Sequence, residues 1–240
     1  MDLKNAVALV TGSSRGIGLE IVKALLAAEP KRVYAAMRDP ATGAALFADS
    51  RVTPVALDVT DEKLIAAAAN ACEDVQLLIN NAGINLRTGF IAATDLKNAR
   101  RELEVNYFGP FRMCRAFAPV LAANGGGMIV NVISSLAYVC IPEMGSLCAS
   151  KGAYSLLTQG VRAELRANGT HVMGVFPGSV KTDMVPYGEA MPEDIAAAIV
   201  QAIRDDEEDL YPSDQARRMM AGLRDDPKAV EREHAKRLPR

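Results

Sequence analysis

The sequence predicts an α/β protein built on one parallel sheet of about seven strands, doubly wound with helices on both faces. Short apolar runs alternate along the chain with segments long enough to form helices. The runs are almost continuously apolar, as strands are when helices cover both faces of a sheet. No linker, repeat or low-complexity tract divides the chain, so we expect a single domain over residues 1–240.

Each expected element follows from this alternation, taken in chain order. The strands are the apolar runs at 7–10, 32–37, 52–57, 77–80, 128–133, 171–176 and 209–211. The crossover helices expected between them lie at 19–28, 62–71, 99–121 and 154–167, and further helices begin at Pro192 and Pro227. Only the last strand is expected to be an exposed edge. A ligand is expected at the carboxyl ends of the strands, near the switch in strand order.

Composition and charge exclude several classes of protein. The formal net charge is -2 and Lys and Arg form no run, which argues against a nucleic-acid surface. No stretch has the length and apolarity of a bilayer span, and the first four residues lead almost directly into a strand, so we expect a cytoplasmic protein without a membrane partner. The four cysteines are scattered and there are only two histidines, so neither a metal site nor a disulfide framework is expected.

A glycine-rich turn follows the first strand in the spacing TGxxxGxG. Glycines there let the backbone turn sharply and approach a pyrophosphate at the positive end of the next helix. The turn therefore predicts a dinucleotide site after the first strand. The residues expected to bind the dinucleotide here are Gly12, Ser14, Arg15, Gly16, Ile17 and Gly18.

The end of the second strand indicates which dinucleotide binds. Arg38 follows this strand, and with Arg15 it offers two guanidinium groups that can converge on a 2′-phosphate. This pair favours NADP(H). Asp39 is the competing residue, because a carboxylate at this place holds the ribose hydroxyls in NAD enzymes, but Asp39-Pro40 is also typical of a helix N-cap.

These motifs and those that follow them resemble the short-chain dehydrogenase/reductase family along the whole chain, which implies a Rossmann fold. Besides the glycine turn, they are Asn80-Asn81-Ala82-Gly83, Asn106, Ser134, Lys151 and Pro177-Gly178. The resemblance implies that Asp58 touches the adenine, although an aspartate there could equally cap the helix that begins near Asp61. It also implies cofactor contacts from Asn80, Ala82, Gly83, Lys151, Pro177, Gly178, Val180 and Thr182.

The resemblance assigns catalytic roles as well. Ser134 would polarise a carbonyl group and Lys151 would bind the nicotinamide ribose, while Ser135 competes with Ser134 one residue out of the family register. Asn106 would hold, through its main-chain carbonyl, a water that links the lysine to solvent; the alternative is a satisfied residue at a helix bend. The family's proton-donating tyrosine stands four residues before the lysine, and here that position is Leu147.

Leucine can neither donate nor accept a proton. Loss of a positioned general acid costs about 10²–10⁴-fold in rate, so we expect impaired proton delivery with cofactor binding retained. Three tyrosines are candidates to replace the missing group: Tyr138 and Tyr187 in loops that could approach a ligand, and Tyr154, which we expect in the core. For all three, packing or pocket lining is the favoured role.

The substrate side is predicted to be open and apolar. A short segment at about 183–191 is the expected substrate lid, and the expected pocket residues are Leu136, Cys140, Met144, Met184 and Tyr187. Such a lining suits a bulky, mostly apolar ketone, aldehyde or secondary alcohol.

Two functions from different classes are compatible with this sequence. The first is an NADPH-dependent carbonyl reductase, or secondary alcohol dehydrogenase, slowed or silenced by Leu147. The second is a non-catalytic NADP(H)-binding sensor or partner subunit. Under either, the resemblance implies a homodimer or homotetramer that pairs through helices near 106–121 and 152–167. A charged C-terminal helix at 227–237 would restrict the assembly to dimers.

Overall fold

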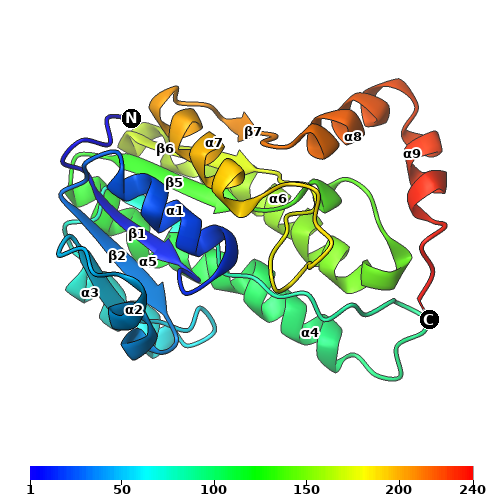
Figure 1. The fold of residues 1–240 in the computed structure, drawn as a ribbon, viewed down its shortest axis with the longest axis horizontal. Helices are drawn as coiled ribbons and strands as arrows, with labels where there is room; N and C mark the ends of the chain where they lie inside the picture. The colour runs from blue at the N-terminus through cyan, green and yellow to red at the C-terminus, as the bar shows by residue number, and fades with distance from the viewer. Residues whose placement is uncertain (240) are drawn as a thin grey trace.

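The computed structural model describes residues 1–239, which form one seven-stranded parallel sheet in the order β3-β2-β1-β4-β5-β6-β7 (Figure 1). The strand order reverses between β1 and β4, so the sheet is doubly wound and the predicted Rossmann fold is confirmed. The strands are β1 Val7–Thr11, β2 Arg32–Met37, β3 Val52–Ala56, β4 Leu77–Asn80, β5 Gly127–Val132, β6 Thr170–Val175 and β7 Asp209–Leu210.

Helices cover both faces of this sheet. On one face α1 and α7 pack together, and residues such as Ile21 and Ile199 form a core with the strands. On the other face α3, α5 and α6 surround Phe117. The helices are α1 Gly16–Leu26, α2 Pro40–Leu46, α3 Glu62–Ala71, α4 Lys97–Leu103, α5 Gly109–Ala123, α6 Gly145–Leu165, α7 Pro192–Arg204, α8 Asp214–Asp225 and α9 Pro227–His234. None of the helices within residues 1–239 has both the length and the apolarity needed to cross a membrane.

The structure corrects three expectations about these elements. The helix expected at 99–121 is divided, because a π-helical turn at Glu104–Phe108 separates α4 from α5. The helix that holds Lys151 begins at Gly145 rather than at Tyr154. Besides β7, β3 is also an edge strand and is partly exposed, and its Pro54 fits such a strand because proline lacks an N–H to pair with a neighbour.

After β7 the chain continues into α8 and α9, and residues of both helices lie over the carboxyl ends of the strands. Figure 1 shows α8 and α9 along one side of the molecule. Pro239, after α9, lies against Gly89 in the loop that precedes α4. Contacts along the chain agree with this path, since the main-chain N–H of Glu143 donates to the oxygen of Arg237 at 3.1 Å. The C-terminal segment is thereby brought to the edge of the sheet where a ligand is expected.

Candidate active site

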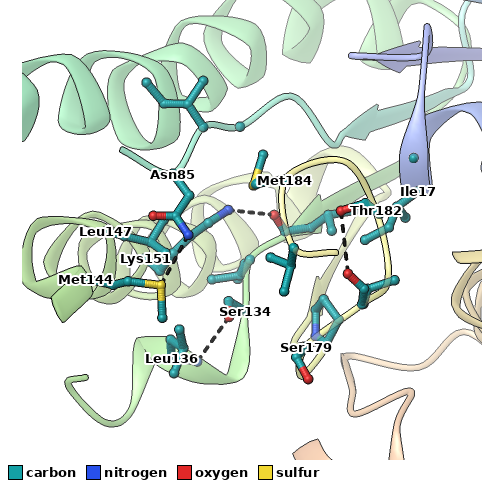
Figure 2. Close-up of a pocket in the computed structure, with 18 of the residues that line it drawn as sticks. Ile17, Asn85, Ser134, Leu136, Met144, Leu147, Lys151, Ser179, Thr182 and Met184 are labelled. Carbon is teal, nitrogen blue, oxygen red and sulfur yellow. Dashed lines mark hydrogen bonds between the residues drawn. The ribbon is translucent and has the colours of Figure 1, made fainter. Parts of the chain in front are cut away.

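A cavity of about 900 Å³ opens at the carboxyl ends of the strands. Its inner part is drawn in Figure 2. Most of the residues predicted from the sequence meet there, although they come from segments far apart in the chain. Those that line the cavity are Gly12, Ser14, Arg15, Gly16, Ile17, Arg38, Asp58, Ala82, Gly83, Ser134, Leu136, Met144, Leu147, Lys151, Pro177, Gly178, Val180, Thr182 and Met184.

The glycine turn is shaped by two steric requirements. Gly12 has φ +67°, a left-handed conformation that favours glycine, and a Cβ atom on it would lie 2.9 Å from the Cα of Ala82. Gly18 is buried in α1, where a Cβ would lie 2.3 Å from the main-chain oxygen of Gly12. Gly18 thus does not line the cavity, contrary to expectation, and instead lets the helix pack closely against the turn.

The asparagine motif after β4 ties this turn to the neighbouring strand. The hydroxyl oxygen of Thr11 accepts hydrogen bonds from the main-chain N–H groups of Asn81 and Ala82, at 3.0 and 3.1 Å. Asn80 is a correction, because its side chain is buried and donates to Asn131 at 3.0 Å rather than facing the cavity. Asn81 lines the cavity and was missed, although it stands in the same motif.

Two arginines are available at the far end of the cavity. Arg15 and Arg38 both line it and are exposed, and neither forms an ion pair with a carboxylate in the described part of the chain. Asp39 does not compete for this place. Its side chain caps α2 by accepting from the N–H of Ala41 at 3.0 Å. The arrangement leaves positive charge available where the second strand ends.

Asp58 also lines this end, and it does not cap α3, because Asp61 does so. Its carboxylate accepts from the main-chain N–H and the hydroxyl of Thr60, at 2.9 and 2.8 Å. Burial by itself raises the pKa of the Asp58 carboxyl, but the hydrogen bonds from Thr60 outweigh this and hold that pKa below its ordinary value. Asp58 is therefore a carboxylate at neutral pH.

Asn106 lies in the π-helical turn between α4 and α5 and is fully buried. Its side-chain amide accepts from the N–H of Ile84 at 2.9 Å and donates to the oxygen of that residue at 3.0 Å. It also donates to the hydroxyl of Ser150 at 3.0 Å. The side chain thus joins the loop after β4 to α6 and is fully satisfied, whereas the water-holding role of its main-chain carbonyl stays a prediction.

Ser134 follows β5 and faces the cavity (Figure 2). Its hydroxyl oxygen accepts a hydrogen bond from the N–H of Leu136 at 3.1 Å, which leaves the hydroxyl proton free to be donated. Ser135 also contributes to the lining, but only 2% of its surface is exposed. Of the two serines, Ser134 is the more accessible from the cavity.

Lys151 projects from α6 into the same cavity and is largely buried. Its Nζ donates to the main-chain oxygen of Val132 at 3.2 Å, two residues before Ser134 on the chain. No carboxylate in residues 1–239 forms an ion pair with it. Burial without a counter-ion lowers the pKa of the Lys151 ammonium to about 8.

Leu147 lies one helical turn before Lys151 and packs in a small apolar cluster (Figure 2). The other buried members are Ile141, Met144 and Cys148, and Leu136 packs against them. With only 8% of its surface exposed, Leu147 forms part of the cavity wall. The wall at this point is apolar, and the structure gives it no proton donor.

None of the six tyrosines, all within the described residues, lines the cavity. Tyr154 is buried and its hydroxyl donates to the oxygen of Asn80 at 3.2 Å, as its expected place in the core requires. The Tyr138 hydroxyl lies 3.4 Å from that of Tyr211, and Tyr187 is 94% exposed. No tyrosine therefore takes the place that Leu147 leaves.

Two expected pocket residues lie elsewhere. Cys140 is exposed and does not line the cavity. Tyr187 points outward because the lid is a tight turn closed on itself, in which Thr182 and Val185 exchange main-chain hydrogen bonds at 3.2 and 3.0 Å. A Cβ on Gly188 would lie 2.1 Å from the main-chain carbon of Val180, so the end of this turn packs directly against the backbone at which the turn begins. Met184 is the expected lid residue that does line the cavity.

The outer wall of the cavity comes from the C-terminal segment, which the sequence analysis missed. Its lining residues are Gln215, Arg218 and Met219 of α8, Ala229, Val230, Glu233 and His234 of α9, and Arg237. The expected open pocket is therefore corrected, because these helices cover the side beyond the short lid. Nothing in the sequence except the amphipathic pattern of this segment could have indicated that it returns to the site.

Two carboxylates hold the C-terminal segment to the rest of the molecule, and Glu189 of the lid is the first, since it pairs with Arg218 of α8 at 3.3 Å. Glu143 accepts from Arg237 at 3.0 Å and pairs with Arg87 at 3.2 Å. The His234 Nδ1 lies 3.0 Å from the oxygen of Val230, so that nitrogen carries the proton in the neutral ring. Among the residues that the structure describes, no three His, Cys, Asp or Glu side chains are grouped so as to hold a metal ion.

Comparison with known proteins agrees with this arrangement. Residues 6–192 match the short chain dehydrogenase family. Galactitol 2-dehydrogenase (L-tagatose-forming) of Cereibacter sphaeroides is 37% identical over 203 residues, 80% of this chain and 78% of that protein. The 2-(R)-hydroxypropyl-CoM dehydrogenase of Xanthobacter autotrophicus is 34% identical over 200 residues, 78% of this chain and 79% of that protein.

A solved structure is similar over almost the whole chain. It is a short chain dehydrogenase from Burkholderia cenocepacia in complex with NADP, with a TM-score of 0.91 and 38% identity. The match covers 98% of this chain and 99% of that chain, so it includes the C-terminal helices.

Proposed function

The chain belongs to the short-chain dehydrogenase/reductase family, and from this premise we propose that it is an NADPH-dependent carbonyl reductase, or a secondary alcohol dehydrogenase in the reverse direction. Its substrate is a bulky, mostly apolar ketone or alcohol. The observation that carries this proposal is that Ser134 and Lys151 line one cavity with the glycine turn of Gly12. A carbonyl-polarising hydroxyl and a buried cation beside a dinucleotide turn suit hydride transfer to a carbonyl.

The residues of the cavity fit NADP(H). The pyrophosphate would lie at the N-terminus of α1, on the turn whose glycines leave no room for a Cβ. Arg15 and Arg38 would hold the 2′-phosphate through charge-assisted hydrogen bonds, and Lys151 would hold the nicotinamide ribose. The NADP complex of the similar Burkholderia cenocepacia protein supports this choice. When bound, the reduced dinucleotide supplies the hydride.

The chain's own residues then act on the carbonyl group. The Ser134 hydroxyl donates a hydrogen bond to the carbonyl oxygen, since its own oxygen is already occupied by the N–H of Leu136. Leu136, Met144 and Leu147 provide an apolar surface for the remainder of the ketone. Leu147 adds no proton donor, so we expect reduction to be slower by about 10²–10⁴-fold than with a tyrosine at this position.

The test is NADPH oxidation with a panel of bulky ketones, measured for the parent chain, Leu147→Tyr and Leu147→Phe. The tyrosine variant should be the fastest of the three. The phenylalanine variant controls for ring size, and it should not gain rate. If the tyrosine variant stays silent while NADPH binds, the reductase function is wrong.

That outcome would favour the second candidate, a non-catalytic NADP(H)-binding sensor or partner subunit. The observation in its favour is that none of the tyrosines, all within the described part of the chain, lines the cavity. In this case NADPH should bind with micromolar or better affinity in every variant of residue 147, and none should turn it over.

We propose in addition that the chain forms a homodimer or homotetramer through α5 and α6. Leu156 on α6 is 69% exposed and Phe108, beside α5, is 41% exposed, and large apolar side chains on paired helices favour association. Sedimentation of the parent and of Leu156→Glu should show the assembly and its loss.

A further inference from the structure

We propose that Lys151 itself donates the proton to the substrate oxygen, in place of the tyrosine that this chain lacks. The proposal rests on the reductase function above and adds a second catalytic role to a residue otherwise assigned to ribose binding. Lys151 is placed where such a donor is needed. Lys151 lies one turn of α6 beyond Leu147, in the cavity that Ser134 also lines.

The hydrogen bonds of Lys151 leave donors free. An ammonium group has three N–H donors, and one of them is used by the oxygen of Val132 at 3.2 Å. That oxygen belongs to the end of β5, just before Ser134, so Nζ is held near the place where a carbonyl would be polarised. Two donors remain for the ribose and for a substrate oxygen, reached directly or through one water.

The surroundings of Lys151 contain no charge that would hold its proton. On its own helix, the neutral ring of Tyr154 lies 5.5 Å from Nζ. Across the cavity, a Cβ on Gly83 would be 3.7 Å from Nζ and 3.3 Å from the neutral amide oxygen of Asn106. Since burial brings the pKa of the ammonium to about 8, it is protonated at pH 7 and releases its proton far more readily than an ordinary lysine.

The other titratable groups of the cavity are poorer donors. Asp58 is a carboxylate held by Thr60 at the adenine end, and the side chain of Asp183 is exposed to solvent. Glu233 is exposed as well, and a hydrogen bond from Lys236 holds the pKa of its carboxyl below the ordinary value. His234 lies on the opposite wall, and its Nδ1 proton is engaged by the oxygen of Val230. Because His234 nevertheless lines the cavity, it is the competing proton donor, and an experiment must distinguish its contribution from that of Lys151.

The step balances in atoms and charge. The carbonyl carbon gains the hydride that a reduced nicotinamide supplies, and the π electrons of the C=O bond move to oxygen. An N–H bond of the Lys151 ammonium breaks and an O–H bond forms, which gives the alcohol and a neutral amine. The amine then regains a proton from water. In this scheme the rate depends on the fraction of Lys151 that is protonated.

The test combines a pH profile with substitutions in two backgrounds. In the parent chain, single-turnover NADPH oxidation should be level below pH 8 and fall tenfold per pH unit above it. Lys151→Arg keeps the positive charge for the ribose but holds its proton, because the guanidinium pKa exceeds about 12. We expect it to slow the parent by about 10²-fold or more, but to slow Leu147→Tyr by less than about tenfold, since tyrosine then donates.

A readout that does not depend on turnover is the NMR titration of the Lys151 side chain in the complex with NADP⁺. A midpoint near pH 8 supports the proposal, whereas a midpoint above 10 overturns it. Equal losses from Lys151→Arg in both backgrounds also overturn it, because the lysine would then serve binding alone. In His234→Gln the fall above pH 8 should persist; its disappearance there would assign the proton to His234 and overturn the proposal.

Failure of this proposal can be distinguished from failure of the reductase function. If Leu147→Tyr reduces ketones and the parent does not, the function stands and Lys151 is not a donor. If neither chain reduces any ketone while both bind NADPH, the reductase function fails and the role of Lys151 fails with it.

Discussion

Glu143 and Arg237 stand 94 residues apart in the sequence and are joined by two hydrogen bonds. The guanidinium of Arg237 donates to the carboxylate at 3.0 Å, and the N–H of Glu143 donates to the main-chain oxygen of Arg237 at 3.1 Å. Leu136 and Met144 lie in the short 3₁₀ turns that precede α6, at Ser135–Ala137 and Pro142–Met144, and line the cavity. The pair of Glu143 and Arg237 therefore connects this wall to the wall from the C-terminal segment.

Arg237→Ala should weaken substrate binding more than it changes the chemical step. The arginine is half exposed, and such a pair contributes about 0.2–1 kcal/mol, so we expect KM for the ketone to rise by no more than about fivefold with kcat retained. Lys228→Ala is the matched control, since it breaks an exposed ion pair between Lys228 and Glu231, which both lie on α9. A fall in kcat with KM unchanged would contradict this assignment.

Arg38→Asp should reverse the cofactor preference. Loss of a charge-assisted hydrogen bond costs about 1.5–3 kcal/mol, so the Kd for NADPH should rise by about 10–100-fold, whereas NADH should bind as well as before or better. Titration of both dinucleotides measures this. Asp39→Asn is the control, because Asp39 caps α2 and should leave the preference unchanged. An unaltered preference in Arg38→Asp would refute the phosphate assignment.

Burial of Lys151 should make the free energy of unfolding depend on pH. Its pKa is about 8 in the folded chain and about 10.4 in an unfolded one. Between these values the unfolded chain binds more protons, so the contribution of this group to the free energy of unfolding rises with pH. Relative to Lys151→Met, the parent should gain about 3 kcal/mol between pH 7 and pH 11. Urea unfolding of both chains at several pH values measures the difference, and a constant difference would contradict the burial.

The four cysteine thiols should react with iodoacetamide at different rates. Burial raises the pKa of Cys72 and Cys114 to about 12 and that of Cys148 to about 11, and a thiol rather than a thiolate reacts slowly. Cys140 is the exposed one. Iodoacetamide at pH 8 should therefore label Cys140 first in the folded chain and all four after unfolding. Equal labelling of the four in the folded chain would show that the core opens readily.

The sequence predicted best those features that depend on neighbouring residues. Strand β2 at Arg32–Met37 and helix α3 at Glu62–Ala71 have the bounds expected for them, and α3 begins where the side chain of Asp61 caps it. The division of the helix around Asn106 was only suggested by its asparagine. The start of α6 was misplaced because its first turn, at Gly145, has no side-chain cap.

The site was harder to predict where contacts between residues far apart in the chain decide which way a side chain points. Tyr187 lies in the expected lid, yet the contact of Gly188 with Val180 closes the turn and leaves the tyrosine outside. Asn80 belongs to a recognisable motif, but its partner Asn131 lies on another strand and draws the side chain into the core. His234 reaches the cavity only because α8 and α9 fold back, and the amphipathic pattern of these helices does not say against which surface they pack.

The path of α8 and α9 adds to the cavity a wall that comes from outside the matched family region. The family match ends at residue 192, and the lining contributed by Met219, Val230 and His234 comes after it. Ser134 and Lys151 come before it. A chimera that exchanges the segment after this boundary would thus receive a different outer wall of the cavity, while Ser134 and Lys151 keep their places.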